Sequence, residues 1–339
     1  FPLFPIIIFG HTYLLLWLDM IPSTPWKLHG KELDSFFPTS VLSGGTMTKI
    51  SEISPPGPKG KLLGELFSAR KDPLDLFLTL TQEYGGIVRF RVAHIPFYLV
   101  SKKEAIKRIL QDNLKNYQKG MSYEHLRAAM GKGLLVSEGD LWKQQRKWIQ
   151  PAFHREKLAQ KISVMTDAIG DLLEQWKPLS QKEAVIDIVS PFMHLAFDMV
   201  GRILMGEEIE GHMEQMETAL NEAGDEVYHR METPFRLPEF FPTPRNRRYK
   251  KALQTLYQVV DHVITRHRES KKETESLLSS MVSVRDEKTG EGMSDTQIRD
   301  EVLTFLMAGH ETTGDALCWT FYLLAEHPEV VDRLGEEVD

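Results

Sequence analysis

Residues 300–322 read DEVLTFLMAGHETTGDALCWTFY and predict a long, mostly buried helix with a polar break at its centre. The break is Ala308-Gly309-His310-Glu311-Thr312-Thr313, and apolar residues fill both flanks. A buried carboxylate, an imidazole and two hydroxyls are costly unless they are paired or hydrated. A glycine inside a helix also costs about 1 kcal/mol relative to alanine. Three unfavourable choices in one place indicate a functional site.

The polar centre of this helix is open to three interpretations. A metalloprotease helix needs a second histidine at position 314, where Gly314 stands, so that motif is excluded. A structural kink would use Gly309 and the hydroxyls to bend a buried helix, but it leaves Glu311 unexplained. In an acid–alcohol pair, Thr312 bonds to the carbonyl of residue 308, Gly309 lets water or a small ligand lie against the backbone, and Glu311 relays protons to solvent. The third interpretation uses every unusual residue, and we prefer it.

Composition limits the class of protein. The chain has 339 residues, of which 42% are hydrophobic and 26% charged, as in soluble globular proteins. The formal net charge of −7 and the lack of a basic stripe with interleaved aromatics argue against nucleic-acid binding. The single cysteine, Cys318, excludes a disulfide framework and a cysteine-rich metal site, and favours a reducing compartment.

Residues 1–46 differ from the rest, with five prolines and only five charged side chains. The apolar run 3–18 is a candidate membrane anchor, although it is shorter than the roughly 20 apolar residues of a spanning helix. A signal peptide is disfavoured because no basic residue precedes the run. A third interpretation is that 1–46 is upstream sequence translated ahead of a native start at Met47. Phe1 at one end and an uncapped helical pattern at the other indicate a chain cut at both ends.

The remaining chain predicts a mainly helical domain with a small β element near its N-terminus. A capping-box pattern from Ser294 to Gln297 should begin the long helix, and His327-Pro328 should end it. Residues 87–92 and 96–100 predict a hairpin, and 114–138 predict a loop-rich segment. The other expected helices are 72–84, 101–113, 140–148, 158–176, 184–205, 213–228, 245–268 and 277–284.

Trp142 and Arg146 lie four residues apart in the basic helix 140–148, so they should share one face. They are either a stacked pair on the surface or an indole and a guanidinium that together bind one anionic group, such as a carboxylate.

The central motif closely resembles the oxygen-binding motif of cytochrome P450 haem-thiolate monooxygenases. Further motifs resemble that family in its order, from about residue 55 to the end, in the style of its soluble bacterial members. They are Pro55-Pro56-Gly57-Pro58, the hairpin 87–100, Trp142 with Arg146, Pro151-Ala152-Phe153-His154, the proline–arginine segment 242–248 and Ala325-Glu326-His327-Pro328-Glu329.

The resemblance implies a role for each matching residue. Thr312, with Glu311, would deliver protons to dioxygen at a haem b, and Ala308 and Gly309 would form the groove for dioxygen. Trp142 and Arg146 would bind a haem propionate, which decides the alternative above for the anion site. Phe305 would face the substrate, with 114–138 and 234–244 near its entrance. The implied reaction inserts one oxygen atom of O2 into an apolar organic substrate, by hydroxylation or epoxidation. Electrons would come from a separate donor (ferredoxin, flavodoxin or a reductase).

The chain departs from the family pattern in two places. The Glu-x-x-Arg pattern after the central helix and the haem-ligating cysteine loop are both missing, because Glu124-x-x-Arg127 lies too early and Cys318 lies on the central helix, facing about 240° away from Thr312. We therefore expect residues 47–339 to form an incomplete cytochrome P450 domain, truncated before its C-terminal haem-binding portion and by itself inactive. The alternative is a non-catalytic helical protein that binds haem or an apolar ligand. We expect a cytoplasmic location, or membrane association through residues 3–18.

Overall fold

The computed structural model describes residues 14–16, 54–58, 73–92, 95–120, 122–180, 185–209, 211–232, 240–270 and 275–338. The predicted boundary at residue 47 lies outside the described residues. So does the apolar run 3–18, except for the strand β1 (Leu14–Leu16). The chain forms two compact units, and each is described by itself. Unit 1 comprises Phe1–His125 and Arg230–Phe235, and unit 2 comprises Leu126–His229 and Arg236–Asp339.

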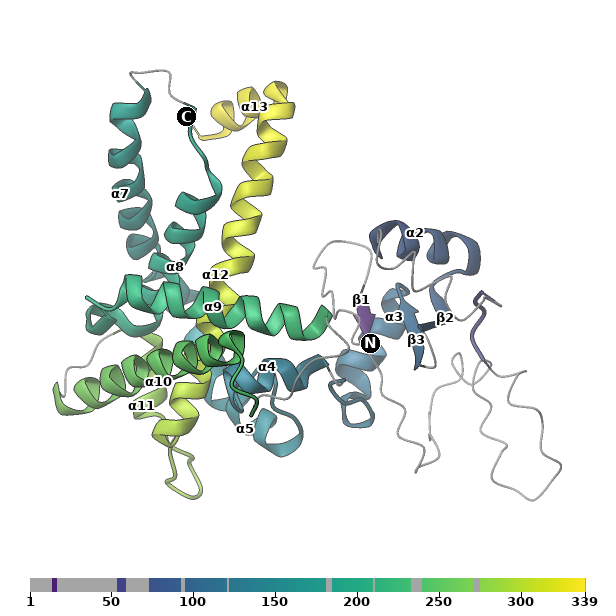
Figure 1. Cartoon of the computed structure of the whole chain (residues 1–339), viewed down its shortest axis with the longest axis horizontal. Coiled ribbons are helices and arrows are strands. Elements are labelled where there is room, and N and C mark those ends of the chain that lie inside the picture. Colours follow the sequence, from purple (N-terminus) through teal and green to yellow (C-terminus); the bar gives the residue numbers. More distant parts are fainter. Residues whose placement is uncertain are drawn as a thin grey trace. The chain divides into compact units, whose positions relative to one another are not determined.

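Unit 1 contains the predicted hairpin. Strands β2 (Ile87–Val92) and β3 (Ile95–Val100) pair antiparallel, and β1 pairs with the other edge of β3. The helix α2 (Pro73–Tyr84) packs on this sheet (Figure 1). Apolar residues of α2 and alternating apolar residues of β2 and β3 make a small core of Phe77, Leu80, Val88, Phe90, Phe97 and Leu99.

The proline-rich connector also belongs to unit 1. The Arg89 N–H donates to the Pro56 carbonyl at 2.9 Å, so the connector lies along β2. A Cβ at Gly57 would come 1.7 Å from the Arg89 carbonyl oxygen, which explains why a glycine stands there.

Unit 2 is built from helices around α12 (Asp295–Glu326), the predicted long helix (Figure 1). Helix α8 packs along α12 and α7 packs on α8, while α10 and α11 also contact α12. The bounds of the other helices of nine or more residues are α4 (Ser122–Met130, which crosses the unit boundary), α5 (Gly139–Ile149), α7 (Ile162–Ser180), α8 (Val189–Met205), α9 (Met213–Glu232), α10 (Pro244–Ser270) and α13 (Pro328–Val338). The shorter α6 spans Arg155–Ala159 and α11 spans Leu277–Ser283.

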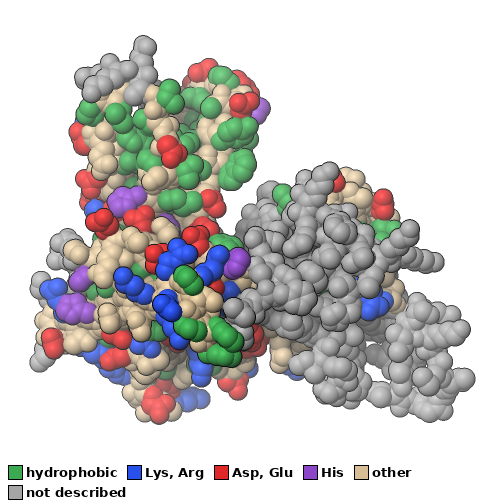
Figure 2. All heavy atoms as spheres, in the orientation of Figure 1, with side chains coloured by type: hydrophobic (Ala, Val, Ile, Leu, Met, Phe, Trp, Pro, Cys, Tyr) green, Lys and Arg blue, Asp and Glu red, His purple; other side chains and the backbone are tan. Residues whose placement is uncertain are grey.

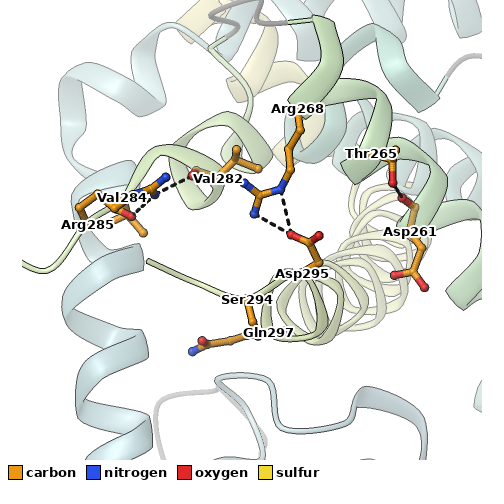
Figure 3. A network of polar contacts seen from close by, with 9 residues as sticks. All are labelled: Asp261, Thr265, Arg268, Val282, Val284, Arg285, Ser294, Asp295 and Gln297. Atoms are coloured by element: carbon orange, nitrogen blue, oxygen red, sulfur yellow. Dashed lines mark hydrogen bonds and ion pairs between the residues drawn. The ribbon is translucent and has the colours of Figure 1, made fainter. Parts of the chain in front are cut away.

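The start of α12 is fixed by the predicted cap. The Ser294 hydroxyl accepts from the Gln297 N–H at 3.2 Å. Asp295 in the first turn accepts from Arg268 of α10 at 2.6 and 2.9 Å (Figure 3). An acidic side chain at this end is favoured because it complements the positive end of the helix dipole.

Two glycines of α12 allow α8 to approach closely. A Cβ at Gly314 would lie 2.4 Å from the sulfur of Met193 and 3.2 Å from its Cα, and a Cβ at Gly309 would lie 2.9 Å from the Val200 side chain. The buried residues of the interface include Phe197 and Leu204 of α8 with Leu303 and Leu306 of α12. Gly309 in the polar centre and Gly314 just after it therefore serve helix packing, a role that the sequence alone did not indicate.

Several expectations about local structure were wrong in part. The predicted helix 184–205 begins only at Val189, and the predicted helix 158–176 is divided between α6 and α7. Residues 114–138 are loop-rich as predicted, but helix α4 interrupts them, and its Leu-Arg-Ala-Ala segment has high helix propensity. The predicted helix 101–113 is α3 (Lys103–Lys107), followed by a π-helical turn, η3 (Arg108–Asp112). The wider turn is a local irregularity that residue periodicity does not reveal.

Large apolar side chains are exposed on α7, on the C-terminal half of α12 and on α13. Figure 2 shows hydrophobic side chains gathered over this part of unit 2. They include Ile162, Ile169 and Leu173 of α7, Trp319, Tyr322 and Leu323 of α12, and Val331 and Leu334 of α13. An apolar surface of this extent is typical of an interface. In the described part of the chain, no helix is long and apolar enough to cross a membrane.

We predict that Gly314→Ala lowers the free energy of unfolding by about 1–3 kcal/mol, because the added methyl group overpacks the contact with Met193. The matched control is Gly170→Ala in α7, where a Cβ would meet nothing within 4 Å. This control should gain about 0.5–1 kcal/mol from the higher helix propensity of alanine. Urea unfolding followed by circular dichroism measures both. Equal stability of the two variants would contradict the close approach of α8.

Candidate functional site

Thr312 and Ala308 share an exposed face of α12. The Thr312 hydroxyl donates to the Ala308 carbonyl oxygen at 2.6 Å, which confirms the predicted bond between these residues. Both residues are exposed, and the helix continues without interruption through them. The hydroxyl therefore lies at a surface. While it donates to the backbone carbonyl, its oxygen can still accept a hydrogen bond from another group.

Glu311 points to a different neighbour, Tyr228 of α9. The phenol donates to the Glu311 carboxylate at 2.9 Å. Burial raises the pKa of Glu311, the bond from Tyr228 acts to lower it, and the nearby Asp315 raises it again. The pKa of Tyr228 is raised by burial and by the carboxylate beside it. A half-buried carboxyl group whose pKa lies above its usual range can gain and lose a proton closer to neutral pH.

His310 lies on the opposite, buried face of α12. Its ring meets Phe197 of α8 edge-on, with centroids 5.4 Å apart and planes at 84°. Burial lowers the pKa of His310 and so favours the neutral imidazole. The imidazole is therefore a packing residue of the α8–α12 interface, on the side away from Ala308 and Thr312.

Trp142 and Arg146 form the predicted stacked pair on α5. The guanidinium carbon lies 5.9 Å from the centroid of the indole. Among the residues that the structure describes, the Arg146 guanidinium has no hydrogen-bond or ion-pair partner and contacts only the Trp142 ring, so its charge can bind an anion. The pair lines an open cavity of about 360 Å³ together with Lys143, Lys147, Gln150, Pro151 and His154. Lys143 pairs with Asp140 and Lys147 with Asp286, so the unpaired guanidinium of Arg146 is the group here that fits a carboxylate ligand.

Phe305 lies one turn before Ala308 and packs on Phe153, with ring centroids 5.6 Å apart. Phe153 ends the turn η5 (Gln150–Phe153) that follows α5. This contact joins α12 to the segment after α5, so Phe305 has a structural role. Its predicted contact with substrate stays a prediction.

Cys318 lies with the cluster formed by α7 and α8. It packs beside Leu317 against Ala168, Phe192 and Leu195. The pKa of the thiol is raised by burial and by Asp315, so the thiol form is favoured. Metal ligation requires the thiolate, so the surroundings of Cys318 do not suit a metal-ligating sulfur.

Sequence reasoning missed several side chains that the structure brings to this region. Tyr228 is 83 residues from Glu311 along the chain, and no local motif pairs them. Gln145, the residue before Arg146, was also missed, and the structure shows that it is fully buried. A glutamine inside a basic amphipathic helix was the available signal.

Comparisons with known proteins agree with this architecture. The family model described as Cytochrome P450 matches residues 55–339. The chain is 33% identical over 279 residues to a cyclooctat-9-en-7-ol 5-monooxygenase of Streptomyces melanosporofaciens, which covers 82% of this chain and 60% of that protein. It is 32% identical over 280 residues to the chloroplastic protein LUTEIN DEFICIENT 5 of Arabidopsis thaliana, covering 78% and 46%. It is 29% identical over 279 residues to a pentalenene oxygenase of Streptomyces avermitilis, covering 82% and 61%.

These matches show the class of the protein, and the mainly α fold agrees with it. The chain belongs to the cytochrome P450 family. It spans about half to three-fifths of the length of the relatives it matches.

The residues present fit one edge and one face of a haem. The unpaired guanidinium of Arg146, stacked on Trp142, suits a propionate. The exposed Ala308 and Thr312 present small side chains, which leave room for a flat ring and a diatomic ligand. Among the described residues, no group of three or more His, Cys, Asp or Glu side chains could hold a metal ion.

We predict that Tyr228→Phe raises the pKa of Glu311 further, because the phenol stabilises the charged carboxylate through its hydrogen bond. The carboxyl signal of Glu311, followed by carbon-13 NMR against pH, measures this change. Tyr322→Phe is the control, because Tyr322 lies on α12 against Trp319 and not against Glu311. An unchanged Glu311 titration in Tyr228→Phe would contradict the contact.

Proposed function

We propose that this chain forms the oxygen-facing wall and the propionate site of a haem-dependent monooxygenase. The whole protein inserts one oxygen atom of O2 into an apolar organic substrate, by hydroxylation or epoxidation. The observation that carries this proposal is the Thr312 hydroxyl, bonded to the Ala308 carbonyl on an exposed helix face. Beside it, Glu311 has a raised pKa.

The cofactor proposed is haem b, which supplies the binding and reductive activation of dioxygen when it is bound. Trp142 and Arg146 hold one propionate and so fix the edge of the ring. Ala308, with a single methyl group, leaves space above the ring, and Gly309 keeps the adjacent backbone accessible. Gly309 also packs closely on Val200 of α8, whose side chain fills the space that a Cβ would take.

Proton movement is assigned to the two polar side chains of the motif. Thr312 holds a proton on its hydroxyl at the exposed face, since the Ala308 carbonyl fixes the direction of its O–H. Glu311 takes protons from solvent and passes them on, and Tyr228 holds its carboxylate in place. General acid–base transfer works best when the pKa of the relay lies near the working pH, which the raised pKa of Glu311 favours.

Cys318 faces the α7–α8 cluster, so we do not assign it as a haem ligand. Residues 47–339 are proposed as part of one catalytic domain, with 1–46 outside it. Phe305 is proposed to face the substrate one turn before Ala308. A cytoplasmic location is proposed for the protein.

Names of relatives support an apolar substrate and an external source of electrons. Two relatives are named for cyclooctat-9-en-7-ol, an unsaturated alcohol by its name, and for pentalenene, an alkene by its name. A relative from Bacillus subtilis is named a bifunctional cytochrome P450/NADPH–P450 reductase, and this chain is 29% identical to it over 305 residues. We therefore propose a largely hydrocarbon substrate and a separate ferredoxin, flavodoxin or reductase as electron donor.

We predict that Thr312→Ala in the holoprotein lowers the fraction of consumed electrons that end in product, because the proton-holding hydroxyl is lost. Thr320→Ala is a matched control: its hydroxyl makes the same 2.6 Å bond to the carbonyl four residues earlier, two turns further along α12. Product formed per reducing equivalent consumed measures both. Equal coupling in Thr312→Ala and the control would refute the proton-delivery role.

The family-level assignment has its own test. The reduced holoprotein with carbon monoxide should show the absorption band of a thiolate-ligated haem. A spectrum without that band would reject the monooxygenase and favour a non-catalytic protein that binds haem or an apolar ligand.

A further inference from the structure

Two buried carboxylates of α12 bind the backbone of the loop 131–138, which joins α4 to α5. Asp300 accepts from the Lys132 N–H at 2.8 Å, and Glu301 accepts from the Leu134 N–H at 2.8 Å. Asp300 is 7% exposed and Glu301 is fully buried. Burying two carboxylates is costly, so strong bonds from amide groups are needed to offset the loss of water.

The loop approaches α12 closely at two glycines. Gly131 has a positive φ of 60°, and a Cβ there would lie 2.3 Å from the Asp300 carboxyl group. A Cβ at Gly133 would lie 1.9 Å from the Thr304 hydroxyl oxygen. Any side chain at either position would push the loop away from the two carboxylates.

The same loop is bound to α5 by Gln145. This fully buried side chain donates to the Lys132 carbonyl at 2.7 Å, and the Ser137 hydroxyl donates to its amide oxygen. Gln145 immediately precedes Arg146 in the chain. A continuous set of hydrogen bonds therefore runs from α12 through the loop to the residue beside the guanidinium.

We propose that Asp300 and Glu301 are positioning residues for the Trp142–Arg146 pair. Asp300 and Glu301 hold the loop 131–138 against α12, and the loop in turn holds Gln145. The two carboxylates thereby fix the position of the Trp142–Arg146 pair relative to the Ala308–Thr312 face. Glu301 precedes Ala308 by seven residues, about 10.5 Å along the helix at 1.5 Å per residue. One rigid helix thus carries both the anchor of the loop and the oxygen-facing residues. The inference rests on the proposed haem site.

The test is a haemin titration of the apoprotein, followed by absorbance, in a double-mutant cycle. Glu301→Ala should weaken haemin binding by about tenfold, the lower end of the range for partners that orient a metal site. Arg146→Ala should weaken it as well. In the Arg146→Ala background, adding Glu301→Ala should change the affinity by less than about twofold, because the two residues act through one contact. Additive effects would overturn the positioning role and leave the proposed function intact.

Conservative and second variants separate positioning from folding. Glu301→Gln should retain affinity, because its amide oxygen still accepts from Leu134 N–H. Affinity as weak as that of Glu301→Ala would overturn the proposal. Gln145→Ala breaks the set of hydrogen bonds at its α5 end. It should weaken haemin binding in the wild-type background but not in the Arg146→Ala background. This variant tests the proposal even if Glu301→Ala fails to fold. Asp295→Ala, which removes an exposed carboxylate of α12, should leave haemin affinity unchanged.

Hydrogen exchange distinguishes failure of this inference from failure of the proposed function. The amides of Lys132 and Leu134 should exchange slowly in the wild type and faster in Glu301→Ala, with core amides of α8 unchanged. Slow exchange in a chain that binds no haemin would reject the haem site, and the positioning role with it, while the loop contact itself stands. Fast exchange in the wild type would overturn the inference directly.

Discussion

The close packing of α8 on α12 is the contact on which unit 2 depends. It requires glycine at position 314, because Met193 fills the space of a Cβ, and it is tightened by Gly309 beside Val200. The interface buries the apolar residues on one side of α12 and also buries His310. Ala308 and Thr312, on the other side, remain exposed. The packing thus decides which part of the polar centre is structural and which is chemically accessible.

Much of this could be predicted from the sequence, because the signals were local. The cap at Ser294, the hairpin and the bond from Thr312 to the carbonyl of residue 308 each involve residues that are close along the chain. The stacking of Arg146 on Trp142 follows from a spacing of four in a helix. Helix α4 was missed because three glycines in 114–138 outweighed a short helical segment between them.

The partners that sequence could not supply come from distant segments. Tyr228 meets Glu311 only because α9 crosses α12, and Leu134 meets Glu301 across 167 residues. The sequence showed Gly309 as a gap for a ligand, because periodicity cannot say which neighbour occupies the space beside a glycine. The α8 contact supplies that neighbour, because the Val200 side chain fills the space beside Gly309.

Four carboxylates of α12 show how surroundings set the role of one chemical group. Asp295 is exposed and pairs with Arg268, which makes it a surface contact of small energetic value. Asp300 and Glu301 are buried and accept backbone N–H groups, so they hold a loop. Glu311 accepts from the Tyr228 phenol, and burial raises its pKa, as burial also raises the pKa of Asp300. Glu311 differs from Asp300 in its position, because it is next to the exposed Thr312, whereas Asp300 accepts the Lys132 N–H and holds a loop.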